Sequence, residues 1–362
     1  MLGLDTLLVP LLTALAVFGT VVVLDSRTVF IRSMDVPPMV KYAGYDPYVI
    51  EDKISSKMID IEQQAFARKS TRKLELEDGD SSIDLIAEYF DLTPLVRAFQ
   101  QSGGFIAYVV EGYITKADDQ NQLKLQITAR DGTETDVTVA APKDKLDALM
   151  DDAAYAVLKV VEPEVVCAAK FQAAIRTKTA LDEVEACIHD SMPEADASSR
   201  IWLTNLAGVV RFVQGDQDGA MEAFKRVLKW SPNFSPALIN VGVLFALNGN
   251  YQDAVRAYES IFADLNDGVS DGTYAAGYVA WAQALAALGR REEAIATLEQ
   301  AIRADHTYAE SYRVLADLTD DPARAQALRE RADAIARDYD QLYTENLVGP
   351  VLEAGLARIH PA

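Results

Sequence analysis

The fold of this chain is decided by residues 235–261, SPALINVGVLFALNGNYQDAVRAYESI. Small residues, Gly242 and Ala254, stand at the eighth and twentieth places of this stretch, and large apolar residues stand at places four, seven, eleven and twenty-four. Two antiparallel helices with this spacing approach closely at the small residues and fill the space between them with the large ones. The stretch therefore predicts a helical hairpin.

The same spacing recurs on both sides of this stretch. A frame that begins at Ile201, 34 residues earlier, carries equivalent residues at the same places: Gly208, Gly215, Ala220, Phe224 and Pro232. After an insertion of about six residues, 269–274, a third frame begins at Ala275, and a fourth begins 34 residues later at Ala309. One hairpin cannot bury its apolar face alone, so the repetition predicts stacked hairpins that form a solenoid with a concave groove.

These motifs resemble the tetratricopeptide repeat (TPR) family over roughly residues 201–338. Thr204 and His306 depart from the family pattern. The family usually has Trp or Leu at the position of Thr204 and Pro at the position of His306. Residues 164–189 are interpreted as one further, divergent helical hairpin ahead of the array. The resemblance implies a TPR α-solenoid that binds a protein or peptide partner.

The resemblance also implies which side chains line the groove, namely those at places 2, 5, 9, 12 and 13 of each first helix. These are Trp202, Asn205, Val209, Phe212, Val213, Ile239, Val243, Leu247, Val279, Gln283, Ala286, Glu310, Arg313 and Asp317. Of the family's clamp for a C-terminal carboxylate, only Asn240 at place 6 is matched, so we expect an amphipathic or extended apolar peptide instead. In the alternative interpretation, several of these side chains pack against a neighbouring repeat.

The chain has two cysteines, Cys167 and Cys187, which lie ten residues on either side of Thr177. If the turn of the divergent hairpin lies there, the two thiols lie at the same height on antiparallel helices. One possibility is a disulfide, which requires an oxidising compartment. The other is a pair of buried, reduced thiols.

The N-terminus has the composition of a membrane anchor. No charged residue occurs in residues 6–24, and at 1.5 Å per residue an eighteen-residue apolar helix spans roughly 27 Å, close to the hydrocarbon core of a bilayer. The flanking residues suit a cleaved signal peptide poorly. Arg27 and Arg32 favour a cytoplasmic body by the positive-inside rule, whereas an N-terminal anchor usually exports the domains behind it. We expect a single-pass inner membrane protein with its soluble part in the periplasm.

Residues 25–163 predict a small α/β domain with a partly antiparallel sheet. The expected strands are 28–36, 73–77, 105–115, 122–130 and 133–140, and the expected helices are 48–67, 81–90, 93–101 and 146–161. Pro37-Pro38 is expected to end the first strand, and Asp131-Gly132 to form a hairpin turn. The run from Ala107, with its hairpin and helix, is similar to the envelope-type α/β domains of TolB-like proteins, which implies a binding module.

Composition excludes several functions. The net charge is −21, with 34 basic and 55 acidic residues, and no basic stripe is present to bind nucleic acid. There is no phosphate-binding loop and no nucleophile elbow. The three histidines, His189, His306 and His360, are far apart in the sequence and do not indicate a metal site. We therefore expect a non-enzymatic protein without a metal or cofactor.

Together these observations predict an α+β, predominantly α, chain with four parts: an anchor at 1–24, the α/β domain at 25–163, the hairpin and repeats at 164–340, and a tail or cap at 341–362. The expected function is that of a membrane-tethered scaffold that assembles or recruits proteins at the bacterial cell envelope. The alternative is a sensory protein in which the α/β domain binds a small molecule and the repeats relay its presence. The oligomeric state does not follow from the sequence.

Overall fold

The computed structural model describes residues 29–32, 34–65, 107–117, 119–262 and 271–338. The chain divides into two compact units. The first holds the described residues up to Asp60 and from 107 to Val161, and the second holds Ile61 to Ala65 and the described residues from Glu162 onward. The expected anchor, the strand at 73–77, the helices at 81–90 and 93–101, and the tail lie outside the described residues.

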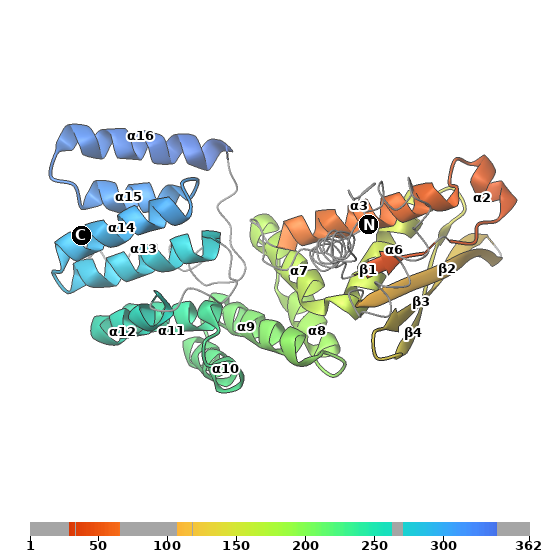
Figure 1. Cartoon of the computed structure of the whole chain (residues 1–362), viewed down its shortest axis with the longest axis horizontal. Helices are drawn as coiled ribbons and strands as arrows, with labels where there is room; N and C mark the ends of the chain where they lie inside the picture. The colour runs from red at the N-terminus through yellow and green to blue at the C-terminus, as the bar shows by residue number, and fades with distance from the viewer. Residues whose placement is uncertain (1–28, 33, 66–106, 118, 263–270, 339–362) are drawn as a thin grey trace, which may run out of the picture. The chain divides into compact units, whose positions relative to one another are not determined.

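The first unit is built on a four-stranded mixed sheet, with strand order β1-β2-β3-β4 (Figure 1). Its strands are β1 (Val29–Ile31), β2 (Tyr108–Ala117), β3 (Gln120–Ala129) and β4 (Glu134–Pro142). β1 runs parallel to β2, whereas β2, β3 and β4 pair as antiparallel hairpins. The expected partly antiparallel sheet is confirmed.

Alternation in β3 explains which face of the sheet is buried. Leu123, Leu125 and Ile127 are buried, whereas the residues between them are at least partly exposed. On the neighbouring strand, Gly112 permits close packing, because a Cβ atom there would lie 2.6 Å from the carbonyl oxygen of Lys124. The expected turn at Asp131-Gly132 joins β3 to β4, and Gly132 takes the positive φ of 86° that this turn requires.

Three helices accompany this sheet: α2 (Pro38–Tyr42), α3 (Pro47–Ala65) and α6 (Leu146–Val161). α6 packs against β3 and β4 through a stripe of buried apolar residues. α3 lies beside α6, because Lys53 Nζ is 2.8 Å from Asp147 Oδ1 and Lys57 Nζ is 3.4 Å from Asp151 Oδ2. α6 covers the residues expected from the sequence.

The start of this unit differs from the expectation. β1 is shorter than the predicted strand, and in the described part of the chain an isolated bridge from Asp35 to Tyr113 continues its pairing. Pro37 and Pro38 do not simply end the strand, because α2 begins at Pro38. A proline at the first helical position loses no hydrogen bond, since that N–H has no partner within a helix.

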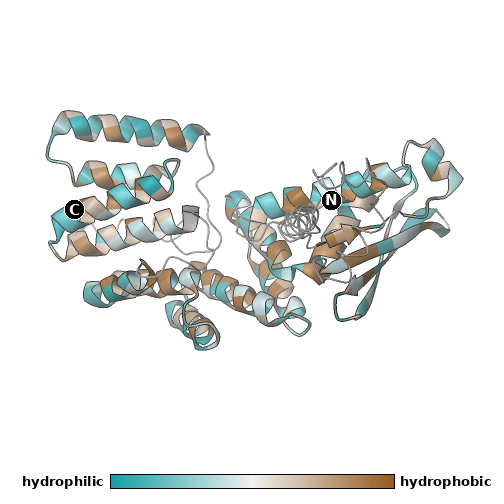
Figure 2. Ribbon diagram, in the orientation of Figure 1, coloured by the Kyte–Doolittle hydropathy of each residue, from teal (hydrophilic) through white to brown (hydrophobic). Residues whose placement is uncertain are grey.

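The second unit is a run of helical hairpins. Its helices are α7 (Pro163–Thr177), α8 (Asp182–Ser191), α9 (Ala197–Val213), α10 (Gln217–Trp230), α11 (Ser235–Leu247), α12 (Tyr251–Phe262), α13 (Asp271–Ala287), α14 (Arg291–Ala304), α15 (Ala309–Asp317) and α16 (Pro322–Asp338). Each odd-numbered helix packs against the next even-numbered helix. Apolar colour dominates the ribbon of α11, whereas the ribbon of α16 has many hydrophilic segments (Figure 2). The predicted repeat of hairpins is confirmed, although α13 begins four residues before the frame at Ala275.

The turns of four hairpins, from α7–α8 to α13–α14, share one backbone conformation. Gly215, Gly249 and Gly289 each follow the first helix of a hairpin with φ between 75° and 91°. This left-handed conformation ends a helix and is favourable only for glycine and a few polar residues. In the α7–α8 hairpin, Lys178 takes the corresponding conformation with φ of 53°.

Close packing inside the hairpins depends on the small residue at place eight. A Cβ atom on Gly208 would lie 2.5 Å from Cε1 of Phe224, and one on Gly242 would lie 2.7 Å from Cε1 of Tyr258. Both rings are fully buried. The first helix can therefore pass directly over an aromatic ring only because a glycine occupies this place.

Candidate functional site

The candidate site is the set of first helices, α9, α11, α13 and α15, on which all the predicted groove residues lie. α13 contacts both α11 and α15 directly, so these three first helices pack side by side. Gly277 on α13 marks this contact, because a Cβ atom there would lie 3.0 Å from Cδ1 of Ile239 on α11. This packing decides which of the predicted residues are accessible.

Two of the predicted residues bond to each other. Asn240 Nδ2 on α11 donates a hydrogen bond to Asn205 Oδ1 on α9, at 3.1 Å. Both side chains are buried, with exposed fractions of 0 % and 1 %. The two amides therefore join the α9–α10 and α11–α12 hairpins, and a buried hydrogen bond of this kind fixes their register.

The predicted apolar residues of the front groove are buried. Val209, Ile239 and Val243 have almost no exposed surface, and the contact of Ile239 with α13 gives the physical reason for its burial. The sequence expectation of an exposed apolar lining is not met at these three positions. A partner cannot reach them unless neighbouring groups move.

Gln283 on α13 is also buried, and its Nε2 atom has no hydrogen-bond partner in the described part of the chain. Trp202 and Phe212 on α9 differ from these residues because both are only half-buried. The ring of Trp202 meets Phe234, just ahead of α11, edge to face with 4.8 Å between ring centroids. Trp202 and Phe212 are therefore the accessible aromatic members of the predicted set, and Val213 and Leu247 are accessible aliphatic members.

Arg313 on α15 is the partly exposed basic member of the predicted set, and the acidic member Asp317 on the same helix is exposed. Its guanidinium lies 3.4 Å from Glu310 on the same helix and 3.7 Å from Asp333 on α16. Burial raises the pKa of the Glu310 carboxyl, and the nearby positive charge of Arg313 opposes this shift. The positive charge of Arg313 is therefore already partly neutralised by the carboxylates of Glu310 and Asp333.

The comparison with protein families identifies one of these hairpins. Residues 275–307, which cover most of α13 and all of α14, match the family described as Tetratricopeptide repeat. This hairpin is a tetratricopeptide repeat. The hairpins on either side of it carry the same spacing of small and large residues.

Solved structures with similarity to parts of the chain include two of MamA. The MamA RS-1 ArsTM double mutant is 18 % identical, covers 49 % of this chain and 96 % of its own, and has a TM-score of 0.35. Another crystal structure of MamA is 24 % identical, covers 42 % of this chain and 77 % of its own, and has a TM-score of 0.27.

A third similar structure is the TPR2AB domain of yeast Sti1 in complex with pHSP90. It is 18 % identical, covers 55 % of this chain and 90 % of its own, and has a TM-score of 0.23. No curated protein matches this chain.

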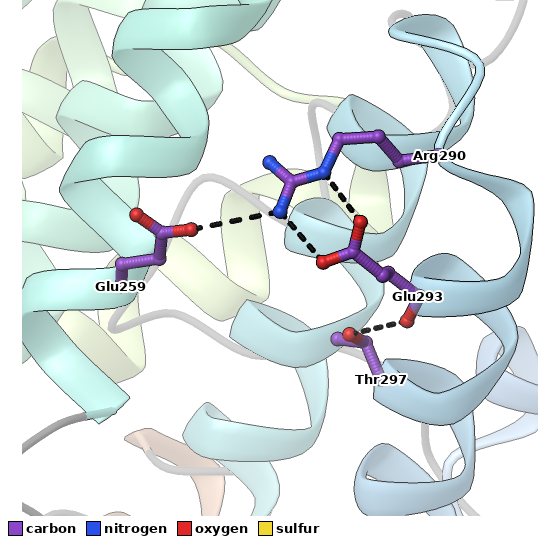
Figure 3. A network of polar contacts seen from close by, with 4 residues as sticks. All are labelled: Glu259, Arg290, Glu293 and Thr297. Carbon is purple, nitrogen blue, oxygen red and sulfur yellow. Dashed lines mark hydrogen bonds and ion pairs between the residues drawn. The ribbon is translucent and has the colours of Figure 1, made fainter.

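A polar network that the sequence analysis did not predict connects the tetratricopeptide repeat to the hairpin before it (Figure 3). Arg290 forms two hydrogen bonds with Glu293, from Nε at 2.7 Å and from Nη2 at 2.6 Å. The same guanidinium lies 3.9 Å from Glu259 on α12. The hydrogen bond with Arg290 lowers the pKa of the Glu293 carboxyl. An Arg three residues before a Glu at a helix start was the available sequence signal.

Further ion pairs continue this arrangement toward the C-terminal end. Arg291 donates a hydrogen bond to the carbonyl oxygen of Leu318 at 2.8 Å and also pairs with Asp320, so it connects α14 to the turn after α15. Arg329 on α16 lies 3.0 Å from Asp317 on α15. The last hairpins of the array are therefore linked through arginine side chains at their surface.

The two cysteines lie in the hairpin ahead of these repeats. α7 ends at Thr177, the residue about which the cysteines are symmetric, and the Cα atoms of Cys167 and Cys187 are 5.6 Å apart. Of the two alternatives, the structure has the disulfide. Cys167 is fully buried and Cys187 nearly so.

Proposed function

We propose that this protein is a non-catalytic adaptor in which the tetratricopeptide repeat array binds a protein or peptide partner. The observation that carries this proposal is the repeat at 275–307, which stands within a run of hairpins that share its spacing. Repeats of this kind present extended surfaces to partners. The adaptor would assemble or recruit its partners at the bacterial cell envelope.

The partner surface of this proposal centres on Trp202 and Phe212, with Arg313 farther along the array. Half-buried aromatic side chains contribute much of the energy in protein interfaces, and arginine is also enriched there. Because Arg313 already faces Glu310 and Asp333, apolar contacts would supply most of the affinity. A peptide with large apolar side chains suits these residues best.

Site-specific photocrosslinking in native membranes tests the partner surface. A photoreactive amino acid at position 202 or 212 is expected to capture one defined partner, identified by mass spectrometry. The matched control is position 230, because Trp230 is an accessible aromatic residue that lies at the end of α10, a second helix. Equal capture from positions 202 and 230, or no protein capture from 202 and 212, would contradict the proposal.

The proposal also includes a tether through residues 6–24, with the soluble part in the periplasm. The apolar composition of residues 6–24 and the disulfide support this location, because disulfides persist in oxidising compartments. Among the described residues, no helix combines the length and apolar character needed to cross a bilayer. The tether therefore depends on residues outside the described part of the chain.

Fractionation tests the tether and its orientation separately. The full chain is expected to stay in the membrane after an alkaline carbonate wash and to be digested by protease added to spheroplasts. A chain that washes off the membrane would contradict the tether. A chain that stays bound but resists protease until the cells are lysed would place the body in the cytoplasm.

A further inference from the structure

Residues 39–48 of the first unit expose several large apolar side chains. Among the described residues, six large hydrophobic side chains are exposed, and three of them fall between residues 39 and 48. Met39, Tyr42 and Tyr48 have exposed fractions of 66 %, 91 % and 73 %. Single exposed apolar residues are ordinary on a soluble surface, whereas three within ten residues of sequence favour an interaction surface. We call these three residues the α2–α3 patch.

Tyr45 and Asp46, which lie between Tyr42 and Tyr48 in the sequence, form hydrogen bonds that stabilise the α2–α3 turn. The hydroxyl of Tyr45 donates a hydrogen bond to Asp147 on α6 at 2.8 Å, and Asp46 accepts one from the backbone N–H of Val49 at the start of α3. These contacts hold the α2–α3 turn in place. The turn therefore presents Met39, Tyr42 and Tyr48 outward on a fixed backbone.

The chemistry of the patch matches the interface of a lipid bilayer. Tyrosine is enriched at membrane interfaces, because its ring is apolar and its hydroxyl is polar. Lys41 is exposed beside Tyr42, and Lys116 Nζ lies 3.0 Å from Met39 Sδ, so two lysines border the patch. Lysine stems lie along apolar surface while their ammonium groups stay in water. The chain as a whole is acidic, so apolar contact and not net charge would hold it at a membrane.

We propose that the α2–α3 patch rests in the headgroup region of the bilayer that holds residues 6–24. This inference deepens the proposed tether and rests on it. The span ends at Leu24 and β1 begins at Val29, and five Cα steps cover at most about 18 Å. The first unit is therefore held close to the membrane surface by its own chain.

The pairing of the strands fixes the orientation that this contact requires. Val29 pairs with Tyr108 at one end of β2, whereas Met39 lies beside Lys116 near the other end (Figure 1). Eight residues of strand correspond to roughly 26 Å, more than the connecting segment spans. A β2 strand that pointed away from the membrane would carry the patch out of reach. Contact between the patch and lipid therefore requires β2 to lie along the bilayer surface or to slope toward it.

Spin labelling of the full chain in liposomes tests this orientation. A nitroxide is attached at Tyr42→Cys, and the label is specific because Cys167 and Cys187 are buried and paired. The control label is at Thr138→Cys, an exposed position on β4 whose side chain points to the sheet face opposite its neighbours Val137 and Val139. The ratio of collision with oxygen to collision with a water-soluble nickel chelate is expected to be several-fold higher at position 42 than at position 138.

Substitution of the other patch residues sharpens the test. With the label at position 42, Met39→Ser combined with Tyr48→Ser is expected to bring the ratio down toward that at position 138. Tyr113→Ser should leave the ratio unchanged, because Tyr113 is an exposed tyrosine on β2 outside the patch. Far-UV circular dichroism of each variant checks that the fold is kept.

Each remaining outcome has one meaning. If the labelled chain does not float with liposomes, the tether fails and this proposal fails with it. If the chain floats but positions 42 and 138 give equal ratios, the tether stands and the patch does not contact lipid. If position 42 is shielded from both oxygen and the chelate, a protein surface covers the patch and the lipid assignment is overturned.

Discussion

The first two repeats and the last two use the same pair of places in different ways. In α9–α10 and α11–α12, place eight is a glycine and place twenty-four is an aromatic residue: Gly208 with Phe224, and Gly242 with Tyr258. In α13–α14 and α15–α16, place eight is an alanine and place twenty-four is smaller: Ala282 with Leu298, and Ala316 with Ala332. All eight residues lie at equivalent positions of one fold.

The difference shows that the side chains at places eight and twenty-four fill the same space between the two helices of a hairpin. A methyl group added at place eight is matched by atoms removed at place twenty-four, as expected for an interior packed to a fixed density. The first two repeats thereby bury a large ring, whereas the last two bury less and add arginine-centred ion pairs between hairpins. The stability of the front of the array should therefore depend more on packing, and that of the rear more on charge.

The largest effect is expected from removal of a ring. Phe224→Ala should lower the free energy of unfolding by about 3–5 kcal/mol, because Phe224 is fully buried and its loss leaves a cavity. Chemical denaturation followed by circular dichroism measures this change. Lys225→Ala, at the exposed neighbouring position, should change the same quantity by less than about 0.5 kcal/mol. Similar costs for the two variants would show that the ring is not packed as described.

Replacing Gly208 and Phe224 of the first repeat by the alanine and leucine of the third repeat tests whether these two side chains fill the same space. Gly208→Ala should cost about 1–2 kcal/mol, because the new methyl group meets the ring of Phe224 and this clash exceeds the gain in helix propensity. Adding Phe224→Leu recreates the alanine–leucine pair of the third repeat. The double variant should then be more stable than the sum of the two single effects predicts. Strict additivity would refute the idea of a shared volume.

Lys178, the turn residue of the α7–α8 hairpin, allows a test with a smaller expected effect. Lys178→Gly should raise the free energy of unfolding by about 0.5–1 kcal/mol, because glycine takes the left-handed conformation without the strain of a side chain. The reverse change, Gly215→Lys, has open space around the new Cβ atom, so any loss of stability reports backbone strain alone. Thermal unfolding of both variants gives the comparison. A stabilising Gly215→Lys would contradict this account.

The smallest effect concerns charge in the fourth repeat. Burial raises the pKa of Glu310 above its ordinary value of 4.5, so the folded state holds this proton more tightly than the unfolded state does. The associated stability is complete below the ordinary pKa and is lost as pH rises through the raised one. Glu310→Gln does not titrate, so its stability relative to the parent chain should increase over the same pH range. A relative stability that falls with pH would mean that the ion pair with Arg313 dominates.

Much of the fold could be predicted because its signals are local. The 34-residue spacing fixed the hairpins, and alternation in β3 and β4 fixed two strands together with the turn at Asp131-Gly132. Pro38 was misread because a proline that ends a strand also suits the first turn of a helix. The early start of α13 was missed because residues 271–274 were assigned to an insertion.

The candidate site was harder to predict because accessibility depends on packing between repeats. Helical spacing places Asn205, Ile239 and Gln283 on one face of their helices, but it does not say how closely the next first helix approaches. The structure buries all three, while Trp202 and Arg313 remain partly exposed. The hydrogen bond that the side-chain amide of Asn240 donates to Asn205 joins residues 35 positions apart, and no local pattern reveals it.

The disulfide between Cys167 and Cys187 makes the hairpins of the array unequal in their resistance to mechanical opening. Each hairpin of a solenoid is held by its immediate neighbours, so an array frays from its ends. The α7–α8 hairpin at the N-terminal end is closed by a covalent bond, whereas α15–α16 is joined by noncovalent contacts. Among the described hairpins, we therefore expect the two helices of α15–α16 to separate more easily than those of α7–α8. A pulling force that acts on both hairpins is expected to open α15–α16 first.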